Sequence, residues 1–275
     1  MAEAIRAALH RAAARLTEHS ETPRLDAELL MAKALAVPRE TLLLGRLDDL
    51  VPDGFEALLA RRLGGEPMAY ILGSRAFWTI ELAVTPAVLI PRPDSETLIE
   101  AAVGHFRGAT GPARILDLGT GSGALLLAAL SEWPQACGIG VDRSTDALAV
   151  ARVNAARLGM AERATFMRGD WAEALAAQFD LILCNPPYVE EGATLSAEVM
   201  REPHAALFAG ADGLDAYRVL APQVTRLLAP HGIACVEVGS TQAPSAGALF
   251  AAQGLAVDVK RDLSGHDRCL VLRLR

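Results

Sequence analysis

Long apolar runs, paired cysteines and positive charge are all scarce in this chain of 275 residues. No stretch of about 18 residues is both strongly apolar and free of charge, so no membrane-spanning helix is expected. Residues 1–16 carry charges throughout, which argues against a secretory signal. The four cysteines form no Cys-x-x-Cys pair, which favours reduced, mostly buried thiols over a metal site. These absences predict a cytoplasmic protein that holds no metal and contacts no membrane.

The shortage of positive charge also limits the partners of the chain. Its 26 lysine and arginine residues are outnumbered by 33 acidic ones, which gives a net charge of −7. Such a chain has no general attraction for a polyphosphate backbone, so non-specific binding of nucleic acid is not expected. Apolar residues still make up 52% of the chain, enough for a buried core in one large domain or two modest ones.

Three regions with different patterns follow one another along the chain. Residues 1–75 show only helical periodicity, which predicts a small all-α domain. Residues 76–93 are β-prone and then rich in proline, which predicts a β-hairpin linker. Residues 94–275 alternate strand-like and helix-like segments, which predicts an α/β domain with a parallel, doubly wound sheet. Its strands are expected over 113–118, 137–142, 164–168, 179–184, 232–238, 255–259 and 268–274, the last two as an antiparallel hairpin at the edge of the sheet.

Local signals mark helix boundaries in the first region. Thr22 followed by Pro23 predicts the start of one helix. Asp53 and Glu56 have the spacing of a capping box, which predicts the start of another. The glycine pair at 64–65 predicts where that helix ends.

A glycine-rich loop follows the first strand of the third region. The loop reads Gly-Thr-Gly-Ser-Gly over 119–123, at the strand end where doubly wound sheets bind ligands. Its glycine spacing differs from the dinucleotide fingerprint, and no lysine follows as in a P-loop. Asp117, just before the loop, can order it by accepting backbone N–H bonds.

Two further strand ends carry residues suited to a nucleoside. Asp142 can accept both ribose hydroxyls, although it can equally cap the following helix. Asp170 and Trp171 can flank an adenine, although the tryptophan can equally be packed in the core. With the glycine loop, these residues predict a nucleoside ligand without a diphosphate, and S-adenosylmethionine is such a ligand.

The strand expected over 179–184 ends in Asn185-Pro186-Pro187-Tyr188. The simpler interpretation is a strand terminator, because prolines stop a strand and fix its exit. The chemical interpretation is that the Asn185 side-chain oxygen and the Pro186 carbonyl each accept one N–H of a substrate NH2 group. The nitrogen lone pair would then point at a sulfonium methyl group, while the Tyr188 ring covers the planar substrate.

The two motifs match the pattern of a known family, and so do three further segments, at 23–30, 66–73 and 90–96. With them, the chain resembles the HemK/PrmC family of protein-(glutamine-N5) methyltransferases over almost its whole length. The glycine loop alone is common among methyltransferases, and Asn-Pro-Pro-Tyr is shared with enzymes that methylate the amines of adenine and guanine. The helical region together with Ile-Pro-Arg-Pro at 90–93 is the more specific part.

The resemblance implies a fold, a cofactor and a partner. The fold is a class I, Rossmann-like methyltransferase domain with a seven-stranded sheet, preceded by a five-helix domain and a β-hairpin linker. The implied methyl donor is S-adenosylmethionine, with S-adenosylhomocysteine as product. The implied substrate is the glutamine of the Gly-Gly-Gln loop of peptide chain release factors. The N-terminal helices would recognise that partner, without direct contact to nucleic acid, and we expect a monomer.

The family's functional residues carry over by position. Asn185, Pro186, Pro187 and Tyr188 would hold the glutamine, with Asn185, Pro186 and Tyr188 as catalytic residues. Two positions depart from the family pattern. Ser95 stands where threonine is expected, a conservative change at a helix cap, and Arg201 stands where an aromatic side chain is expected. The implied cofactor-binding residues are Gly119, Thr120, Gly121, Ser122, Gly123, Asp142, Asp170, Trp171 and Asn185.

Four other polar residues lie near the expected site. Arg92, in the linker, either lines the mouth of the site or contacts the release factor, or it has a structural role as a helix cap or in a salt bridge. Glu202 and His204 follow a loop able to close over the substrate, and a structural role for His204 is favoured over a role as general base. Glu237 ends a strand near the cleft and either faces it or orders loops.

Three other functions remain open at this point. One is methylation of a glutamine in a ribosomal protein. Another is N6-adenine or N2-guanine methylation of nucleic acid, which uses the same motif but usually needs a basic surface. The third is non-enzymatic nucleoside binding, against which the intact glycine loop and Asn185 argue.

Overall fold

The computed structural model describes residues 3–275 and divides into two compact units. The first comprises residues up to 74 together with 195–201, and the second comprises 75–194 and 202–275. The expected linker, residues 76–93, falls within the second unit, and a short segment after the Asn-Pro-Pro-Tyr motif belongs with the helical unit. Within residues 3–275, no helix is both long enough and apolar enough to span a bilayer, and no group of three or more potential ligands is arranged to hold a metal.

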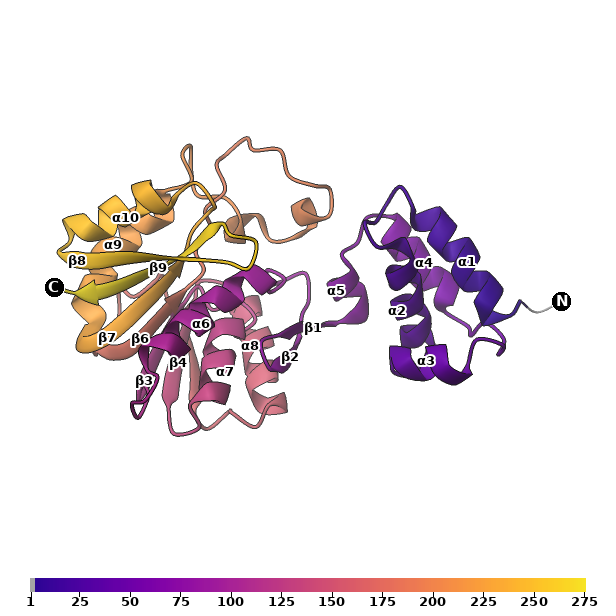
Figure 1. Ribbon diagram of the computed structural model, residues 1–275, viewed down its shortest axis with the longest axis horizontal. Coiled ribbons are helices and arrows are strands. Elements are labelled where there is room, and N and C mark those ends of the chain that lie inside the picture. The colour runs from indigo at the N-terminus through magenta and orange to yellow at the C-terminus, as the bar shows by residue number, and fades with distance from the viewer. Residues whose placement is uncertain (1–2) are drawn as a thin grey trace. The chain divides into compact units, whose positions relative to one another are not determined.

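The helical unit contains the five helices that the resemblance implies (Figure 1). Its core consists of apolar side chains spaced along their inner faces, including the fully buried Leu9, Leu30, Phe55 and Leu59. The helices are α1 (Ile5–Leu16), α2 (Pro23–Leu35), α3 (Arg39–Gly45), α4 (Phe55–Leu63) and α5 (Met68–Leu72).

The helix boundaries are mostly those expected, with one correction. Helix α2 begins at Pro23, and α4 ends just before the glycine pair. The expected capping box is wrong: α4 begins after Gly54, which has φ 90°, and no side chain caps it. The Glu56 carboxylate instead accepts from Arg11 at 2.7 Å and from Arg15 at 3.1 Å. The carboxylate therefore bonds to arginines on α1 and not to the N-terminal backbone of its own helix.

A buried arginine ties residues 195–201 into the helical unit. The Arg62 side chain, only 6% exposed, pairs with Asp26 at 2.8 Å and with Glu198 at 3.0 Å. Arg201 donates to the backbone carbonyl of Gly64. Burial of a guanidinium is costly without carboxylate partners, so Arg62 needs both.

The linker forms the expected hairpin of two paired strands, β1 (Ser74–Phe77) and β2 (Ile80–Ala83). Side chains of the larger unit hold its turn and its second strand. The Trp78 indole donates to Glu132 at 2.6 Å, and the backbone N–H of Ala83 donates to the Asn154 side chain at 2.7 Å.

The larger unit is built on the expected seven-stranded sheet, in the order β5-β4-β3-β6-β7-β9-β8. Strands β3 to β7 pair in parallel, while β9 is antiparallel to both of its neighbours, which confirms the hairpin at the sheet edge. The strands are β3 (Arg114–Leu118), β4 (Cys137–Asp142), β5 (Ala164–Arg168), β6 (Phe179–Cys184), β7 (Leu228–Glu237), β8 (Leu255–Arg261) and β9 (Asp267–Leu274).

Strand β7 begins four residues earlier than expected. The strand continues through Pro230 and Gly232, where the register with β6 shifts between Phe179 and Leu181 and accommodates them. Gly232 is needed there, because a Cβ atom would lie 2.7 Å from the carbonyl oxygen of Asp180.

Helices cover both faces of the sheet (Figure 1). One core contains Leu98, Leu126 and Leu148 from α6, α7 and α8, and the other contains Tyr217 and Phe250 from α9 and α10. The carboxyl ends of β3 and β6 meet at the reversal of strand order, the place where such sheets bind ligands. The helices are α6 (Glu96–His105), α7 (Ala124–Glu132), α8 (Thr145–Arg157), α9 (Asp215–Leu227) and α10 (Ala243–Ala252), with short 3-10 turns at Pro93–Ser95, Val199–Arg201 and His204–Ala206.

Candidate active site

The glycine loop leaves β3 in a backbone path that only glycine adopts readily. Gly119, Gly121 and Gly123 have φ values of 73°, 53° and 83°. The loop is fastened to the end of β4, because the N–H of Gly119 donates to the Val141 carbonyl at 2.9 Å and the N–H of Gly121 donates to the Asp142 carboxylate at 2.9 Å. Contacts of the loop backbone with β4 therefore help to fix the path of the loop.

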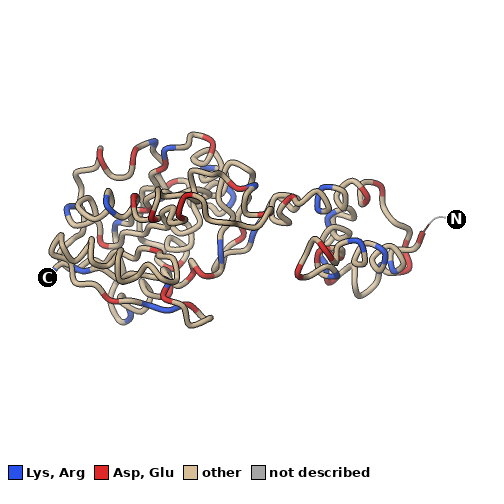
Figure 2. Tube along the Cα trace, turned by 90° about the horizontal axis from the view of Figure 1, so that it is seen from above, with Lys and Arg blue, Asp and Glu red and all other residues tan. Residues whose placement is uncertain are grey.

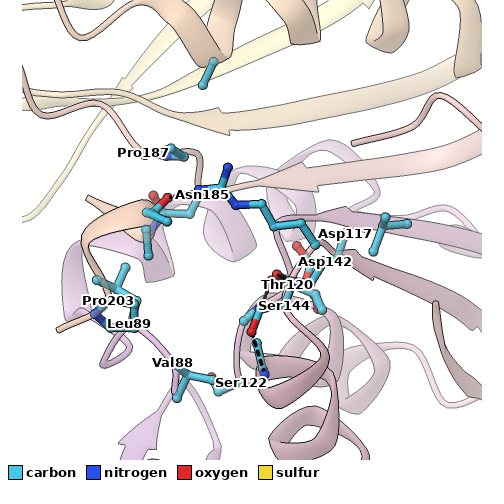
Figure 3. A pocket seen from close by; sticks show the side chains of 18 of the residues that line it. Val88, Leu89, Asp117, Thr120, Ser122, Asp142, Ser144, Asn185, Pro187 and Pro203 are labelled. Atoms are coloured by element: carbon cyan, nitrogen blue, oxygen red, sulfur yellow. Dashed lines mark hydrogen bonds between the residues drawn. The ribbon is translucent and has the colours of Figure 1, made fainter. Parts of the chain in front are cut away.

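A cavity of about 560 Å³ lies at these strand ends, within the size range of small-molecule sites (Figure 3). The glycine loop and Asp142 form one part of its wall, and Asn185 forms another (Figure 3). Apolar side chains of Phe77, Val88 and Phe208 complete the wall. The cavity therefore brings the two motifs to one site.

Asp117 supplies a buried carboxylate to this wall. Its Oδ2 accepts from the Thr120 hydroxyl at 2.6 Å, while its Oδ1 is the one buried side-chain polar atom within residues 3–275 that has no partner. Burial raises the pKa of this carboxyl to about 7. An orphaned carboxylate oxygen beside a cavity suits a ligand that carries positive charge or N–H donors.

Asp142 contacts the segment before α8 without being the N-cap residue of that helix, and it also holds the glycine loop; its role toward the ribose hydroxyls stays a prediction. Its Oδ1 accepts from the N–H of Ser144 at 2.9 Å, next to the start of α8, and its Oδ2 holds the glycine loop. Ser144 itself caps α8 by accepting from the N–H of Ala147 at 3.2 Å. A carboxylate has about four lone-pair sites, so Asp142 retains acceptor capacity toward the cavity it lines.

Most of the expected cofactor residues line the cavity. They are Gly119, Thr120, Gly121, Ser122, Asp142, Asp170, Trp171 and Asn185. Gly123 is not among the lining residues. A Cβ atom there would lie 3.1 Å from the Leu127 side chain and 3.4 Å from that of Ala151. The absence of a side chain at Gly123 therefore leaves room for these residues of α7 and α8.

Trp171 forms a wall of the cavity in an uncommon backbone conformation, with φ 47°. Its ring atom Cζ3 lies 3.4 Å from where a Cβ atom on Gly119 would stand. The aromatic ring and the bare loop backbone are therefore neighbours, and a side chain on Gly119 would press against the ring.

Asn185 leaves β6 directly beside the glycine loop. Leu118 at the end of β3 pairs with Cys184, so the residues that follow each strand are side by side. The Asn185 carbonyl oxygen lies 3.9 Å from the position of a Cβ atom on Gly119. The Asn185 side-chain amide donates through Nδ2 to the Ser95 hydroxyl at 3.1 Å.

Tyr188, the last residue of the motif, is held by contacts with Glu237 and Gln242. Pro187 lines the cavity, whereas Pro186 and Tyr188 are not among its lining residues. The Tyr188 hydroxyl donates to Glu237 at 3.3 Å, and its carbonyl accepts from the Gln242 side chain at 3.0 Å. Burial raises the pKa of Tyr188, so its hydroxyl remains a donor at neutral pH.

Ser95 and Glu237 complete this arrangement through a contact that the sequence did not predict. Ser95 stands at the N-cap of α6, but its side chain makes no capping bond, so the expected cap is wrong. Its hydroxyl donates instead to Glu237, which ends β7 and is 1% exposed. Burial raises the pKa of Glu237 to about 7. An acid ending a buried strand was the available signal, but nothing in the sequence pairs it with Ser95.

The other candidate polar residues have structural partners. Glu202, 5% exposed, accepts from the backbone N–H of Ile90 at 2.8 Å and pairs with Arg92. His204 is exposed and stacks on Phe208, with ring centroids 4.3 Å apart. The salt bridge between Arg92 and Glu202 fastens the linker to the segment after the motif.

Comparisons with known proteins identify the family. Residues 7–73 match the PrmC N-terminal domain, and residues 110–258 match a methyltransferase domain. A release factor glutamine methyltransferase of Rhodospirillum rubrum is 47% identical over 262 residues, covering 93% of this chain and 80% of the relative. A protein of the same name from Cereibacter sphaeroides is 44% identical, covering 99% and 98%. The chain belongs to the PrmC family of release factor glutamine methyltransferases.

Membership in this family confirms the resemblance drawn from the motifs, and solved structures support its fold. A methyltransferase from Pyrococcus furiosus superposes with a TM-score of 0.52 at 16% identity, covering 72% of this chain and 90% of that one. The catalytic domain of hMettl16 superposes with a TM-score of 0.55 at 13% identity, covering 72% and 77%. At such low identity these structures show only that the fold is that of a class I methyltransferase.

Proposed function

We propose that this protein transfers a methyl group from S-adenosylmethionine to the side-chain nitrogen N5 of the glutamine in the Gly-Gly-Gln loop of peptide chain release factors. The observation that carries the proposal is the junction of the glycine loop with Asn185 on one cavity, in a chain that matches relatives of this name over nearly its full length. S-adenosylhomocysteine would be the product.

The residues of the cavity fit S-adenosylmethionine. The unpartnered Oδ1 of Asp117 suits the ammonium group of the ligand, Asp142 suits the ribose hydroxyls, and Trp171 offers an aromatic face beside bare backbone. When bound, the ligand supplies an electrophilic methyl group on a sulfonium. Because such a methyl group is strongly electrophilic, the protein needs to position the nitrogen more than to activate it with a strong base.

The proposed contribution of this chain is to orient the substrate amide. The Asn185 side-chain oxygen and the Pro186 carbonyl would each accept one N–H of the glutamine amide. Held this way, the nitrogen lone pair points toward the methyl group instead of remaining delocalised into the carbonyl. Tyr188 would support this geometry from behind, because its hydroxyl is committed to Glu237.

The relatives favour this substrate over the alternatives considered from the sequence. They carry the release factor name, and the match extends through the N-terminal helical unit. Basic and acidic positions are interspersed along the traces of both units (Figure 2), whereas enzymes that methylate nucleic acid usually need a basic surface. We propose the helical unit as the module that recognises the release factor, and we propose a monomer.

A methyl-transfer assay tests the proposal. Labelled S-adenosylmethionine and a purified, unmodified release factor are incubated with the protein, and the peptides are read by mass spectrometry. A single added methyl group on the Gly-Gly-Gln glutamine is the expected result. If the protein binds the methyl donor but leaves the release factor unmodified while methylating ribosomal protein or nucleic acid, the proposed substrate is wrong.

A further inference from the structure

A chain of three hydrogen bonds connects the two functional side chains of the Asn-Pro-Pro-Tyr motif, running from Asn185 and Ser95, which line the cavity, to residues outside its lining. Asn185 Nδ2 donates to Ser95 Oγ at 3.1 Å, and Ser95 Oγ donates to Glu237 Oε2 at 2.5 Å. The other oxygen of Glu237 accepts from the Tyr188 hydroxyl at 3.3 Å. One buried carboxylate therefore anchors both the amide and the ring of the motif.

The chemistry of the groups fixes the direction of this chain. Above a pH of about 7, where Glu237 is ionised, its carboxylate has no proton, so Ser95 must donate its single hydroxyl proton to Glu237. Ser95 can then only accept from Asn185, which requires the NH2 side of the amide to face the serine. The opposite side, Oδ1, is the acceptor that the proposed reaction needs, and the hydrogen bonds within residues 3–275 leave it available.

Other contacts keep Glu237 in place. The Tyr217 hydroxyl donates to the Glu237 backbone carbonyl at 3.0 Å, and Glu237 pairs with Cys269 across the antiparallel strands β7 and β9. The positive charge of Arg268, whose side chain is only 11% exposed, favours the ionised form of Glu237. A carboxylate with 1% exposure is expensive to retain, which calls for a purpose beyond packing.

We propose that Ser95 and Glu237 are positioning residues that fix the orientation of the Asn185 side-chain amide. The inference rests on the proposed role of Asn185 in orienting the substrate. Without the serine hydroxyl, or without a proton-free acceptor behind it, the amide is free to rotate by half a turn. The rotated amide presents donors to the N–H donors of the substrate, which is a repulsive arrangement.

Three variants and one control separate this role from simple packing. Ser95→Ala removes the hydroxyl, Ser95→Thr keeps it, and Glu237→Gln replaces one of the two accepting carboxylate oxygens with a donating NH2 group. The control is Ser131→Ala, which removes a partly buried hydroxyl that donates to the Ala128 carbonyl in α7 at 2.7 Å. Full-length proteins are assayed with S-adenosylmethionine and an unmodified release factor.

We expect Ser95→Ala, which removes the hydroxyl between Asn185 and Glu237, and Glu237→Gln, which removes the charged acceptor, to lower kcat by roughly tenfold or more. The KM for release factor and the Kd for S-adenosylmethionine should stay within about threefold, and Ser95→Thr should retain most of the activity. The control should match the wild type. Equal losses in Ser95→Ala and Ser95→Thr, unchanged kcat in Ser95→Ala, or a loss confined to KM would overturn the proposal.

A second measurement does not depend on the substrate. The side-chain amide protons of Asn185, observed by NMR in the protein without substrate, should be protected from exchange in the wild type and in Ser95→Thr. They should lose this protection in Ser95→Ala. Protection that is the same in Ser95→Ala as in the wild type would overturn the positioning role. A wild type that shows this pattern yet methylates no release factor would contradict the proposed function alone.

Discussion

The two halves of the cavity wall are built in different ways. At the ends of β3 and β4, the contacts join near neighbours in the sequence: Thr120 bonds Asp117 three residues away, and Gly121 bonds Asp142 at a separation of 21 residues. At the ends of β6 and β7, the three hydrogen bonds that link Asn185, Ser95, Glu237 and Tyr188 join residues 49 to 142 positions apart, and all three run between side chains.

This difference indicates a division of labour. The β3–β4 half presents backbone N–H groups and bare glycine backbone, whose positions follow from the path of the loop. The β6–β7 half depends on the orientation of the Asn185 amide. That orientation depends on which atoms carry the protons of two hydrogen bonds, the one between Asn185 and Ser95 and the one between Ser95 and Glu237. We therefore expect changes in the first half to weaken cofactor binding and changes in the second half to slow methyl transfer.

The largest expected effect comes from Asn185→Ala in the β6–β7 half. Removing the acceptor should lower kcat by about 10²–10³-fold, the usual cost of losing a positioned group at a reacting centre. Binding of S-adenosylmethionine, measured by calorimetry, should change by no more than a few-fold, because the glycine loop is intact. Equal losses of binding and turnover would mean that the two halves do not act separately.

The same contrast explains what the sequence could and could not predict. The glycine loop and Asn185 follow directly after an apolar strand and Asp142 ends one, so their place at one sheet edge follows from the α/β pattern alone. Ser95 and Glu237 meet only because β7 lies next to β6 and because α6 starts beside the end of β7, where Glu237 stands. No local pattern encodes that contact, and the N-cap position of Ser95 suggested another use for its hydroxyl.

The second prediction uses the buried charge of the β6–β7 half. The pKa of Glu237 is raised from 4.5 to about 7, so the folded protein favours its protonated form. This contribution to stability is fully present below pH 4.5 and is lost as the pH rises through about 7. Glu237→Gln lacks this loss, so its free energy of unfolding relative to the wild type should increase by on the order of 3 kcal/mol from acid to alkaline pH.

Urea unfolding of both proteins at intervals between pH 4.5 and pH 8 measures this difference. Asp117, whose pKa is also raised to about 7, titrates in both proteins and cancels. A difference that does not vary with pH would mean that Glu237 is not a buried, titrating acid. The groups that face Glu237, the same in both proteins, are Asp94, Ser95, Cys184, Tyr188, Tyr217, Arg268 and Cys269.

The third prediction addresses the β3–β4 half. Asp142→Ala removes the carboxylate that holds Gly121 and leaves that N–H without its partner. We expect the Kd for S-adenosylmethionine to rise by about ten- to thirtyfold, with kcat at saturating cofactor nearly unchanged. Asp146→Ala, an exposed acid in the first turn of α8, is the matched control and should bind normally. A fall in kcat without weaker binding would contradict the division between the halves.

The smallest expected effect tests how much of the β6–β7 half depends on the ring anchor. Tyr188→Phe removes only the hydroxyl that donates to Glu237 at 3.3 Å, while the ring, the Gln242 contact and the Ser95 bond to the carboxylate all remain. The Asn185 amide therefore keeps its orientation, and kcat should fall by no more than about three- to fivefold, the cost of one neutral donor. Steady-state kinetics with saturating S-adenosylmethionine measures it. A loss as large as that of Ser95→Ala would mean that Tyr188, and not the serine, holds the carboxylate in place.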